Sequence, residues 1–439
     1  MTPRTPDSLP VDAASAAKLA AIGLRLDLVD TADRQLFGAW LEADARGFHE
    51  PSFREELLGP ALDSMAYRRT TGVWEDSSPN LTPVATVSSW ATELTVSPDR
   101  IAEAWAISAV TVSPTAAGKG IARALLEGEL RTAAAAGCPL AILTVSESTL
   151  YGRYGFGPSA LSADWTVTAK RAKWTGPIPG GRVELVQPQD FVGDVTALHE
   201  RVRLQTPGQI EMWARRWSQL ASTSGEDPDR GRATRAARYL DEGGVVRGVM
   251  VYRVIGEEPE SASRTLWIDN LTTETPDAAA ALWRLAIEMP LVGKIIAAAR
   301  PVDEPMRWQV SDFRAVTSAT YDHLWTRILD VPEALAARSY SAPGSVALEV
   351  TDPLDYTTGT WLFEADADGT GRATRIESAP TGIPSLVLGI SELSSMYLGG
   401  VSATTLADAG RVTELTPGSA AAMDTIFHSA RVPWLPLWF

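Results

Sequence analysis

The sequence predicts an α/β protein with mixed sheets, divided into more than one domain. An apolar run typical of a buried strand, 104–112, is followed by a glycine-containing turn and by a strong helical pattern over 121–136. A similar order of strand, turn and helix recurs over 265–289. The chain has 439 residues, which is more than a single hydrophobic core usually supports, so about two to four domains are expected.

The first region, residues 22–168, is expected to alternate strands and helices. Residues 24–29 are typical of a strand, and the helical pattern over 32–46 follows Asp30 and Thr31, which are good N-cap residues. The remaining expected elements are strands over 65–75, 84–94 and 140–145, of which the first two form an antiparallel pair. Residues 170–181, with prolines and paired glycines, are expected to form a linker to the next region.

The turn before the helix at residue 121 contains Gly118, Lys119 and Gly120. A glycine-rich turn between a strand and a helix presents free backbone N–H groups and the positive end of the helix dipole, which together bind phosphate or pyrophosphate. The spacing does not fit the Walker pattern, and the first glycine of a dinucleotide-binding fingerprint is missing. Taken alone, the turn is also compatible with the ordinary start of a helix.

The second region has a comparable organisation but a different helix start. Residues 235–240 and 245–255 are typical of a hairpin, a strand is expected over 265–271, and a helix over 278–289. Asp277 stands where the first region has its glycines. An aspartate at a helix N-terminus caps the helix and repels a pyrophosphate. The second region is therefore expected to repeat the shape of the first without its anion site, although strand, turn and helix can also recur by chance.

The third region begins near Trp308 and differs in character. Within it, residues 324–332 are expected to form a helix that ends at Pro332. Strands are expected over 345–350, 360–365 and 371–376. The segment Ser391–Gly400, which ends in two glycines, completes the region and is similar to the helix-and-Gly-Gly element of sterol-carrier-like domains.

Three motifs along the chain occur together. The first is the loop Ala117–Ala122, the second is Tyr151-Gly-Arg-Tyr-Gly-Phe-Gly157, and the third is the apolar end Pro433-Trp-Leu-Pro-Leu-Trp-Phe439. The set resembles the Eis family (enhanced intracellular survival proteins), which are actinobacterial N-acetyltransferases of the GNAT superfamily. Its acetyl-CoA loop reads Gln/Arg-x-x-Gly-x-Gly/Ala, and this chain departs from it by carrying Ala117 in place of Gln or Arg.

The resemblance implies tandem GNAT domains followed by a sterol-carrier-like domain. It implies a catalytic GNAT domain that binds acetyl-CoA over 22–168 and a degenerate GNAT-like domain over 169–307. A sterol-carrier-like domain would follow over 308–439, with a C-terminal tail that enters the active site. Residues 1–21 are rich in Pro, Ser, Ala and Asp and lack the apolar centre of a signal peptide, so they are expected to form a disordered lead-in.

The resemblance also assigns roles to single residues of the first domain. The main chains of Ser108, Val110 and Val112 would bind the thioester oxygen and the pantetheine arm. The loop residues that would bind the cofactor pyrophosphate are Gly118, Lys119, Gly120, Ile121 and Ala122.

Two residues are assigned to catalysis. Tyr151 matches the family's general acid, and a phenol with a pKa near ~10 can pass a proton to a thiolate whose pKa is near ~8.5. The alternative is that Tyr151 only packs under the loop. The C-terminal carboxylate of Phe439 would act as general base or hold a cationic amine; the alternative is a tail docked for stability. Glu50 falls where the family places an acidic residue of the substrate pocket.

Composition restricts the partners. The formal net charge of −15 argues against nucleic acid and favours cationic small molecules, although many bacterial proteins are acidic simply for solubility. No run approaches the ~18–20 apolar residues that a membrane span needs. The single cysteine, Cys138, fits a reducing cytoplasm, with secretion in the absence of a signal peptide left open. The four histidines show no metal-ligand spacing, so no metal is expected.

The expected function is acetyl-CoA-dependent N-acetylation of primary amines on a cationic small molecule. Aminoglycoside-like compounds are the acceptors that the resemblance suggests, and polyamines are the close alternative. A different class of function, a non-catalytic acyl-CoA or lipid-binding protein with a sterol-carrier-like module, is the competing interpretation. Fifteen tryptophans and the family resemblance together suggest a homo-oligomer, and the resemblance sets the number at a hexamer.

Overall fold

The computed structural model describes residues 9–77, 79–225, 227–256 and 264–439. The strands are β1 (Leu24–Leu28), β2 (Arg69–Glu75), β3 (Ala85–Ser97), β4 (Arg100–Val112), β5 (Leu140–Thr144), β6 (Gly157–Thr168), β7 (Arg182–Val186), β8 (Thr234–Leu240), β9 (Val246–Ile255), β10 (Arg264–Thr273), β11 (Val292–Arg300), β12 (Val316–Ile328), β13 (Gly344–Thr351), β14 (Gly359–Ala365), β15 (Gly371–Ile376), β16 (Ser385–Gly389) and β17 (Val412–Glu414). They form one sheet in the order β1-β2-β3-β4-β5-β12-β6-β11-β10-β9-β8-β7 and a second in the order β15-β14-β13-β16-β17.

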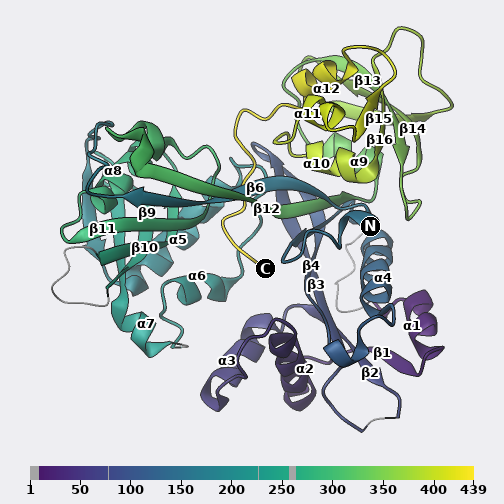
Figure 1. The fold of residues 1–439 in the computed structure, drawn as a ribbon, viewed down its shortest axis with the longest axis horizontal. Helices are drawn as coiled ribbons and strands as arrows, with labels where there is room; N and C mark the ends of the chain where they lie inside the picture. The colour runs from purple at the N-terminus through teal and green to yellow at the C-terminus, as the bar shows by residue number, and fades with distance from the viewer. Residues whose placement is uncertain (1–8, 78, 226, 257–263) are drawn as a thin grey trace.

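Helices cover both sheets (Figure 1). They are α1 (Ala13–Ala20), α2 (Arg34–Gly47), α3 (Glu55–Met65), α4 (Ile121–Ala136), α5 (Pro188–Arg203), α6 (Ala214–Leu220), α7 (Pro228–Ala233), α8 (Pro276–Ile287), α9 (Val331–Ala337), α10 (Ile390–Met396), α11 (Ala403–Asp408) and α12 (Ser419–Phe427). Short 3₁₀ turns are η2 (Pro114–Ala116), η3 (Gly152–Tyr154), η4 (Pro305–Trp308) and η5 (Phe313–Ala315). The expected mixed α/β architecture in three parts is confirmed.

The first domain contains β1 to β5 with helices on both faces of the sheet. Helices α1 and α4 share one apolar core with β4 and β5, and α2 and α3 share another with β2. Helix α4 has the expected bounds because Gly120 and Gly137, both in the left-handed conformation, lie at its two ends. The domain therefore presents the turn at Gly120 at one fixed end of a well-packed helix.

Strand β12 corrects the expected helix over 324–332. It pairs antiparallel with both β5 and β6, so it lies inside the large sheet, and Pro332 is in the first turn of α9 rather than at a helix end. A short apolar run does not distinguish a buried strand from a buried helix, and a strand with neighbours on both sides is apolar on both faces. Because β12 connects the two halves of the sheet, the expected boundary at residue 308 is also wrong.

The expected disordered lead-in over 1–21 is wrong for its described part. Residues 13–20 form α1, which Asp12 caps by accepting a hydrogen bond from the N–H of Ser15 at 2.7 Å. The guanidinium of Arg131 on α4 binds the same Asp12 carboxylate, and the Ser15 hydroxyl donates to the Ala124 carbonyl at 2.6 Å. Alanine-rich composition fits a packed helix as well as a flexible segment. Residues 1–8 lie outside the described residues.

The third domain consists of the five-stranded sheet with α9 to α12. After α12 the chain leaves this domain and runs back between the first and second domains, ending near the centre of the molecule (Figure 1). The Trp434 N–H donates to the Pro207 carbonyl at 2.9 Å, and its indole donates to the Ala299 carbonyl at 2.7 Å. The last segment is thus held by the second domain on its way to the first.

Candidate functional site in the first domain

The N-terminus of α4 is open. Gly118 and Gly120 have φ angles of +78° and +76°, and a Cβ at either position would meet no atom within 4 Å. The glycines are therefore required by the backbone conformation and leave space in front of the helix. No side chain of the described residues caps α4, and Ala117 to Gly120 are exposed. Free N–H groups, the helix dipole and the Lys119 side chain together fit an anionic pyrophosphate.

Strands β4 and β5 are parallel neighbours over only three residues of each. Their pairing covers Ala104–Ala106 of β4, beyond which β4 continues to Val112 along β3 alone. The main chain of β4 is therefore exposed to the gap between the two strands. Ser108, Val110 and Val112, the residues expected to bind the pantetheine arm, lie on this unpaired part, and their side chains are half-buried.

A β-bulge interrupts β4 inside this gap. Ser108 pairs with Ser88 and Thr111 with Thr86, so two residues of β4 lie opposite one residue of β3. Ala109 has a φ of +55°, which is unfavourable for a residue with a Cβ, and the Thr86 hydroxyl donates to its carbonyl at 2.8 Å. A bulge re-aims the backbone N–H groups around it. The sequence contains no glycine or other signal that would have predicted it.

Tyr151 lies at the start of the 3₁₀ turn η3. Its side chain is 7% exposed, and its ring meets that of Phe156 edge-on with centroids 6.2 Å apart. Burial, with a further contribution from the negative charge of Glu147, raises the pKa of the Tyr151 phenol above its ordinary value. Tyr151 thus keeps its proton at neutral pH, as a general acid must.

The end of the chain lies beside the gap between β4 and β5. The hydroxyl of Thr144, the last residue of β5, donates to the main-chain oxygen of Phe439 at 2.8 Å. The Phe439 ring meets Trp90 of β3 edge-on with centroids 5.4 Å apart. One residue earlier, Trp438 packs edge-on against His323, whose Nε2 is 2.8 Å from the Leu437 carbonyl. These contacts fix the last residues against β3 and β5 of the first domain and against β12.

Trp90, which the Phe439 ring contacts, also connects this end of the chain to two groups of opposite charge, Arg68 and Asp44. The Arg68 guanidinium lies over the Trp90 ring, 4.3 Å from its centroid, and 5.8 Å from that of Trp213. Asp44 of α2 has a carboxylate oxygen without a hydrogen-bond partner among the described residues. Burial raises the pKa of Asp44 to about 7, since the attraction of Arg68 only partly offsets that effect and Glu50 adds to it. A carboxyl that titrates near neutrality suits proton transfer or the binding of an amine.

Sequence reasoning missed Asp44 and selected Glu50. The signal for Asp44 was its spacing from Phe37 and Leu41, which places a carboxyl on the apolar face of α2. Glu50, by contrast, is exposed beyond the end of that helix and lines an open depression of about 370 Å³. Its effect on the site is electrostatic, because its negative charge contributes to the raised pKa of Asp44.

The corresponding helix start in the second domain is closed. Thr275, between β10 and α8, accepts a hydrogen bond from the Ala278 N–H at 3.2 Å, so a side chain satisfies a donor that is free in α4. Pro276 removes another N–H, and Asp277 adds a negative charge in the first turn. Asp277 was expected to cap a helix that begins at residue 278, but the helix begins at Pro276 and Thr275 is its cap. The charge of Asp277 in the first turn would still disfavour an anion.

Neither a metal site nor a membrane span is found in the part of the chain that the structure describes. Its residues contain no group of three or more His, Cys, Asp or Glu side chains placed to hold a metal ion. None of the described helices is both long and apolar enough to cross a membrane.

Comparisons with known proteins agree with this arrangement. Models of an acetyltransferase (GNAT) domain match residues 30–159 and 208–339, and a model of a sterol carrier protein domain matches 331–436. The second match extends to residue 339 and so includes β12, in keeping with the corrected boundary. The fold and the site thus define a GNAT acetyltransferase with two such domains.

Relatives over most of the chain refine this class. An uncharacterized N-acetyltransferase of Streptomyces coelicolor is 33% identical over 92% of this chain and 98% of its own length. The N-acetyltransferase Eis of Mycobacterium tuberculosis is 31% identical over 76% of this chain and 81% of its own. The crystal structure of Eis1 from Mycobacterium abscessus aligns with a TM-score of 0.77 and 25% identity, covering 95% of this chain and 100% of that one. The chain belongs to the Eis-like N-acetyltransferases, which confirms the family, the enzyme class and acetyl-CoA as co-substrate over the non-catalytic alternative.

Proposed function

We propose that the first domain transfers the acetyl group of acetyl-CoA directly to a primary amine of a cationic small molecule. An aminoglycoside-like compound or a polyamine is the proposed acceptor. The observation that carries the proposal is the position of Phe439, whose main-chain oxygen lies 2.8 Å from the hydroxyl of Thr144, at the end of the strand that diverges from β4. A terminal carboxylate at this point and the Asp44 carboxyl would draw a cationic amine toward the exposed main chain of β4.

The cofactor site is proposed at the expected residues. The N–H groups of Gly118, Lys119 and Gly120, with those of Ile121 and Ala122 in the first turn of α4, would hold the pyrophosphate. The main chains of Ser108, Val110 and Val112 would hold the pantetheine arm. An N–H group beside the bulge at Ala109 would polarise the thioester carbonyl, because hydrogen bonds directed at developing negative charge stabilise the transition state.

The proposed reaction includes a proton transfer from the attacking amine and another to the leaving thiolate. The reacting ammonium first loses one proton to solvent, and the neutral nitrogen then forms a bond to the thioester carbon. Its second proton passes to a carboxylate, either the Phe439 terminus or Asp44, and from there to solvent. The carbon–sulfur bond then breaks, and the Tyr151 phenol gives its proton to the leaving thiolate. Tyr151 regains a proton from solvent. Its raised pKa keeps it ready for this role throughout the neutral range.

The test is a thiol-release assay with acetyl-CoA and a panel of amines. An aminoglycoside, a polyamine and a neutral monoamine are compared at low and high salt. The expected result is thiol release that requires the amine, favours the polycations and weakens with salt, since the acidic surface attracts them electrostatically. Thiol release that is independent of the amine, or equal for the neutral monoamine, contradicts the proposal.

We also propose that the chain forms a homo-oligomer, a hexamer by analogy with the family, in the cytoplasm. Four strongly exposed apolar side chains are Ile178, Leu185, Leu291 and Trp308, with exposed fractions of 63% to 79%. They belong to the second domain and its linker, and we infer that these side chains contribute to the interface between subunits. Light scattering at micromolar concentration tests the proposal, and a monomer contradicts it.

A further inference from the structure

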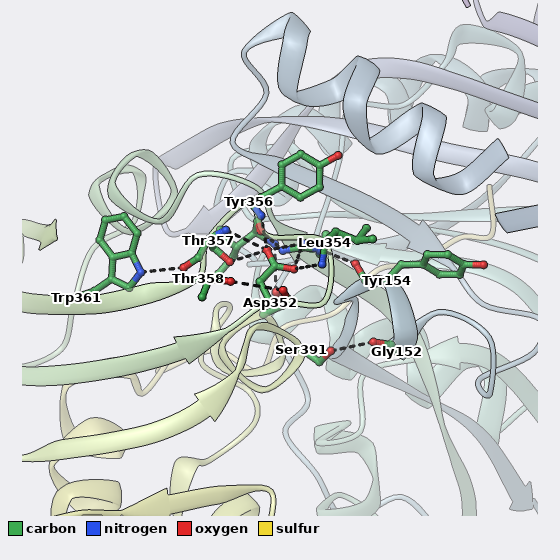
Figure 2. Close-up of polar contacts among 12 residues, drawn as sticks. Gly152, Tyr154, Asp352, Leu354, Tyr356, Thr357, Thr358, Trp361 and Ser391 are labelled. Atoms are coloured by element: carbon green, nitrogen blue, oxygen red, sulfur yellow. Dashed lines mark hydrogen bonds and ion pairs between the residues drawn. The ribbon is translucent and has the colours of Figure 1, made fainter. Parts of the chain in front are cut away.

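The third domain contacts the turn that follows Tyr151. Figure 2 shows two sets of polar contacts at this turn, one made directly by Ser391 of that domain and one around its Asp352, which is linked to Tyr154 through Arg327 of β12. The Ser391 hydroxyl donates to the Gly152 carbonyl at 3.2 Å. On the other side, the Arg327 guanidinium donates from Nε to the Tyr154 carbonyl at 2.7 Å. Both carbonyls of the turn are thus held from outside the first domain's own elements.

Arg327 is in turn fixed by a carboxylate. Its side chain and that of Asp352 are both 0% exposed, and one guanidinium nitrogen binds the two carboxylate oxygens at 2.6 and 2.8 Å. The same carboxylate accepts from the N–H groups of Leu354, Tyr356 and Thr357, each at 3.0 Å, and from the Thr357 hydroxyl at 2.9 Å. Burial alone would raise the pKa of Asp352, but Arg327 and these donors hold it below its ordinary value. The pair is ionised and its orientation is fully determined.

Two glycines allow this close approach. A Cβ on Gly155 would lie 2.5 Å from Arg327 Nε, and one on Gly157 would lie 2.0 Å from the Ser391 carbonyl. The turn is therefore shaped to receive the third domain. Within it, the Tyr154 N–H donates to the Tyr151 carbonyl at 3.0 Å, so the residue whose carbonyl Arg327 holds is itself hydrogen-bonded to the main chain of Tyr151.

We propose that Arg327, Asp352 and Ser391 are positioning residues that hold the Tyr151 turn in its reactive geometry, so that the third domain completes the active site of the first. This inference rests on the proposed role of Tyr151 as general acid. A buried ion pair is a poor means of merely joining two domains, because apolar side chains of similar volume do so at least as well. The pair instead holds the Arg327 guanidinium in one orientation, so that it donates a hydrogen bond to the Tyr154 carbonyl. The Tyr151 phenol has no hydrogen bond to any of the described residues, so its position depends on the main chain that carries it.

The experiment is a double-mutant cycle between Arg327→Lys and Tyr151→Phe. Lysine keeps the positive charge beside Asp352 but cannot reproduce the planar set of donors. Arg327→Lys is expected to lower kcat by about tenfold with the KM for acetyl-CoA unchanged, since a small displacement of a reacting group has effects of this size or larger. In the Tyr151→Phe background the same substitution is expected to change kcat by less than about twofold. A general loss of folding would instead lower kcat equally in both backgrounds, which overturns the inference.

Arg338→Lys is the matched control. Like Arg327 of β12, Arg338 is a buried arginine; it follows α9 in the third domain and donates to the Tyr397 and Phe427 carbonyls without touching the turn. Its substitution is expected to lower thermal stability to a similar degree and leave kcat unchanged at a temperature well below both melting points. A kcat loss equal to that of Arg327→Lys contradicts the inference.

Ser391→Ala keeps the test decisive if Arg327→Lys does not fold. This substitution removes one hydroxyl at a half-buried site, and it is expected to lower kcat two- to fivefold only when Tyr151 is present. If Tyr151→Phe itself retains normal kcat, the proposed acid is wrong, and the proposed function fails at that point. If Tyr151→Phe is impaired but neither Arg327→Lys nor Ser391→Ala shows coupling to it, the acid stands and the positioning role is refuted.

Discussion

The two GNAT domains share a strand order but differ at the start of one helix. In the first domain α4 begins after Gly120, no side chain of the described part of the chain caps it, and its turn is exposed. In the second, Thr275 accepts a hydrogen bond from an N–H of α8 that a phosphate would need. Pro276 has no N–H to offer, and Asp277 adds a negative charge that disfavours an anion. The same fold therefore has an open helix start in one copy, which we propose as the pyrophosphate site, and a capped helix start in the other. We expect three adjacent residues, Thr275 to Asp277, to decide the difference.

The largest expected effect comes from giving the first domain the charge of the second. Gly120→Asp should reduce acetyl-CoA binding below detection in calorimetry, because it places a carboxylate and a strained φ of +76° at the pyrophosphate. Gly137→Asp is the matched control. Gly137 also has a positive φ and open space around it, but it lies at the other end of α4. Unchanged binding in Gly120→Asp, or an equal loss in both variants, contradicts the site.

The next effect concerns the residue that the second domain lacks. The segment after β11, residues 301–309, contains no tyrosine, whereas the segment after β5 contains Tyr151. Tyr151→Phe should lower kcat by roughly 10²–10⁴ with little change in acetyl-CoA affinity, the range for loss of a general acid. Tyr154→Phe keeps the main-chain carbonyl that Arg327 binds and serves as control. Normal kcat in Tyr151→Phe would return that residue to a packing role.

The C-terminal tail contacts both GNAT domains, and its terminal carboxylate can be changed without substituting a residue of either domain. Converting the Phe439 carboxylate to an amide by protein ligation removes one charge and adds no bulk. The kcat/KM for the amine should fall about ten- to a hundredfold, as expected for the loss of a charged partner. Appended residues should have at least this effect because they also fill the site. Acetyl-CoA binding should persist in both proteins, and unchanged kcat/KM in the amide would leave the tail with a structural role alone.

The smallest expected effect is on stability. The pKa of Asp44 is raised by burial, so the folded protein binds this proton more tightly than the unfolded chain. The charge of Asp44 therefore costs stability increasingly as the pH rises from about 4 to about 7, and the cost stays above that range. Asp44→Asn should raise the melting temperature at pH 8 relative to wild type, with little difference near pH 4, while weakening activity on cationic amines. Thermal melts at both pH values measure this, and a variant less stable at pH 8 than wild type contradicts it.

The elements that could be predicted from the sequence are those marked by residues close together in the chain. Helix α4 was predicted at its observed bounds because a helical pattern lies between two glycines. The acidic start of α8 was also recognised, although Thr275 rather than Asp277 is its cap. What failed depended on distant partners. Strand β12 is identified by pairing with β5 and β6, and the bulge at Ala109 by the register of β3. Asp44 became a candidate only once Arg68 and a buried environment were placed around it.

Calorimetric titration of the wild-type chain with acetyl-CoA tests the central claim most directly. Both domains have the fold, but only the first has an open helix start, so the account predicts one binding site per chain. Its affinity should fall with salt, because the contacts are made to a charged pyrophosphate. Two sites per chain, or one site that survives in Gly120→Asp, would contradict the account and place acetyl-CoA at a helix end that Thr275 and Asp277 were inferred to close.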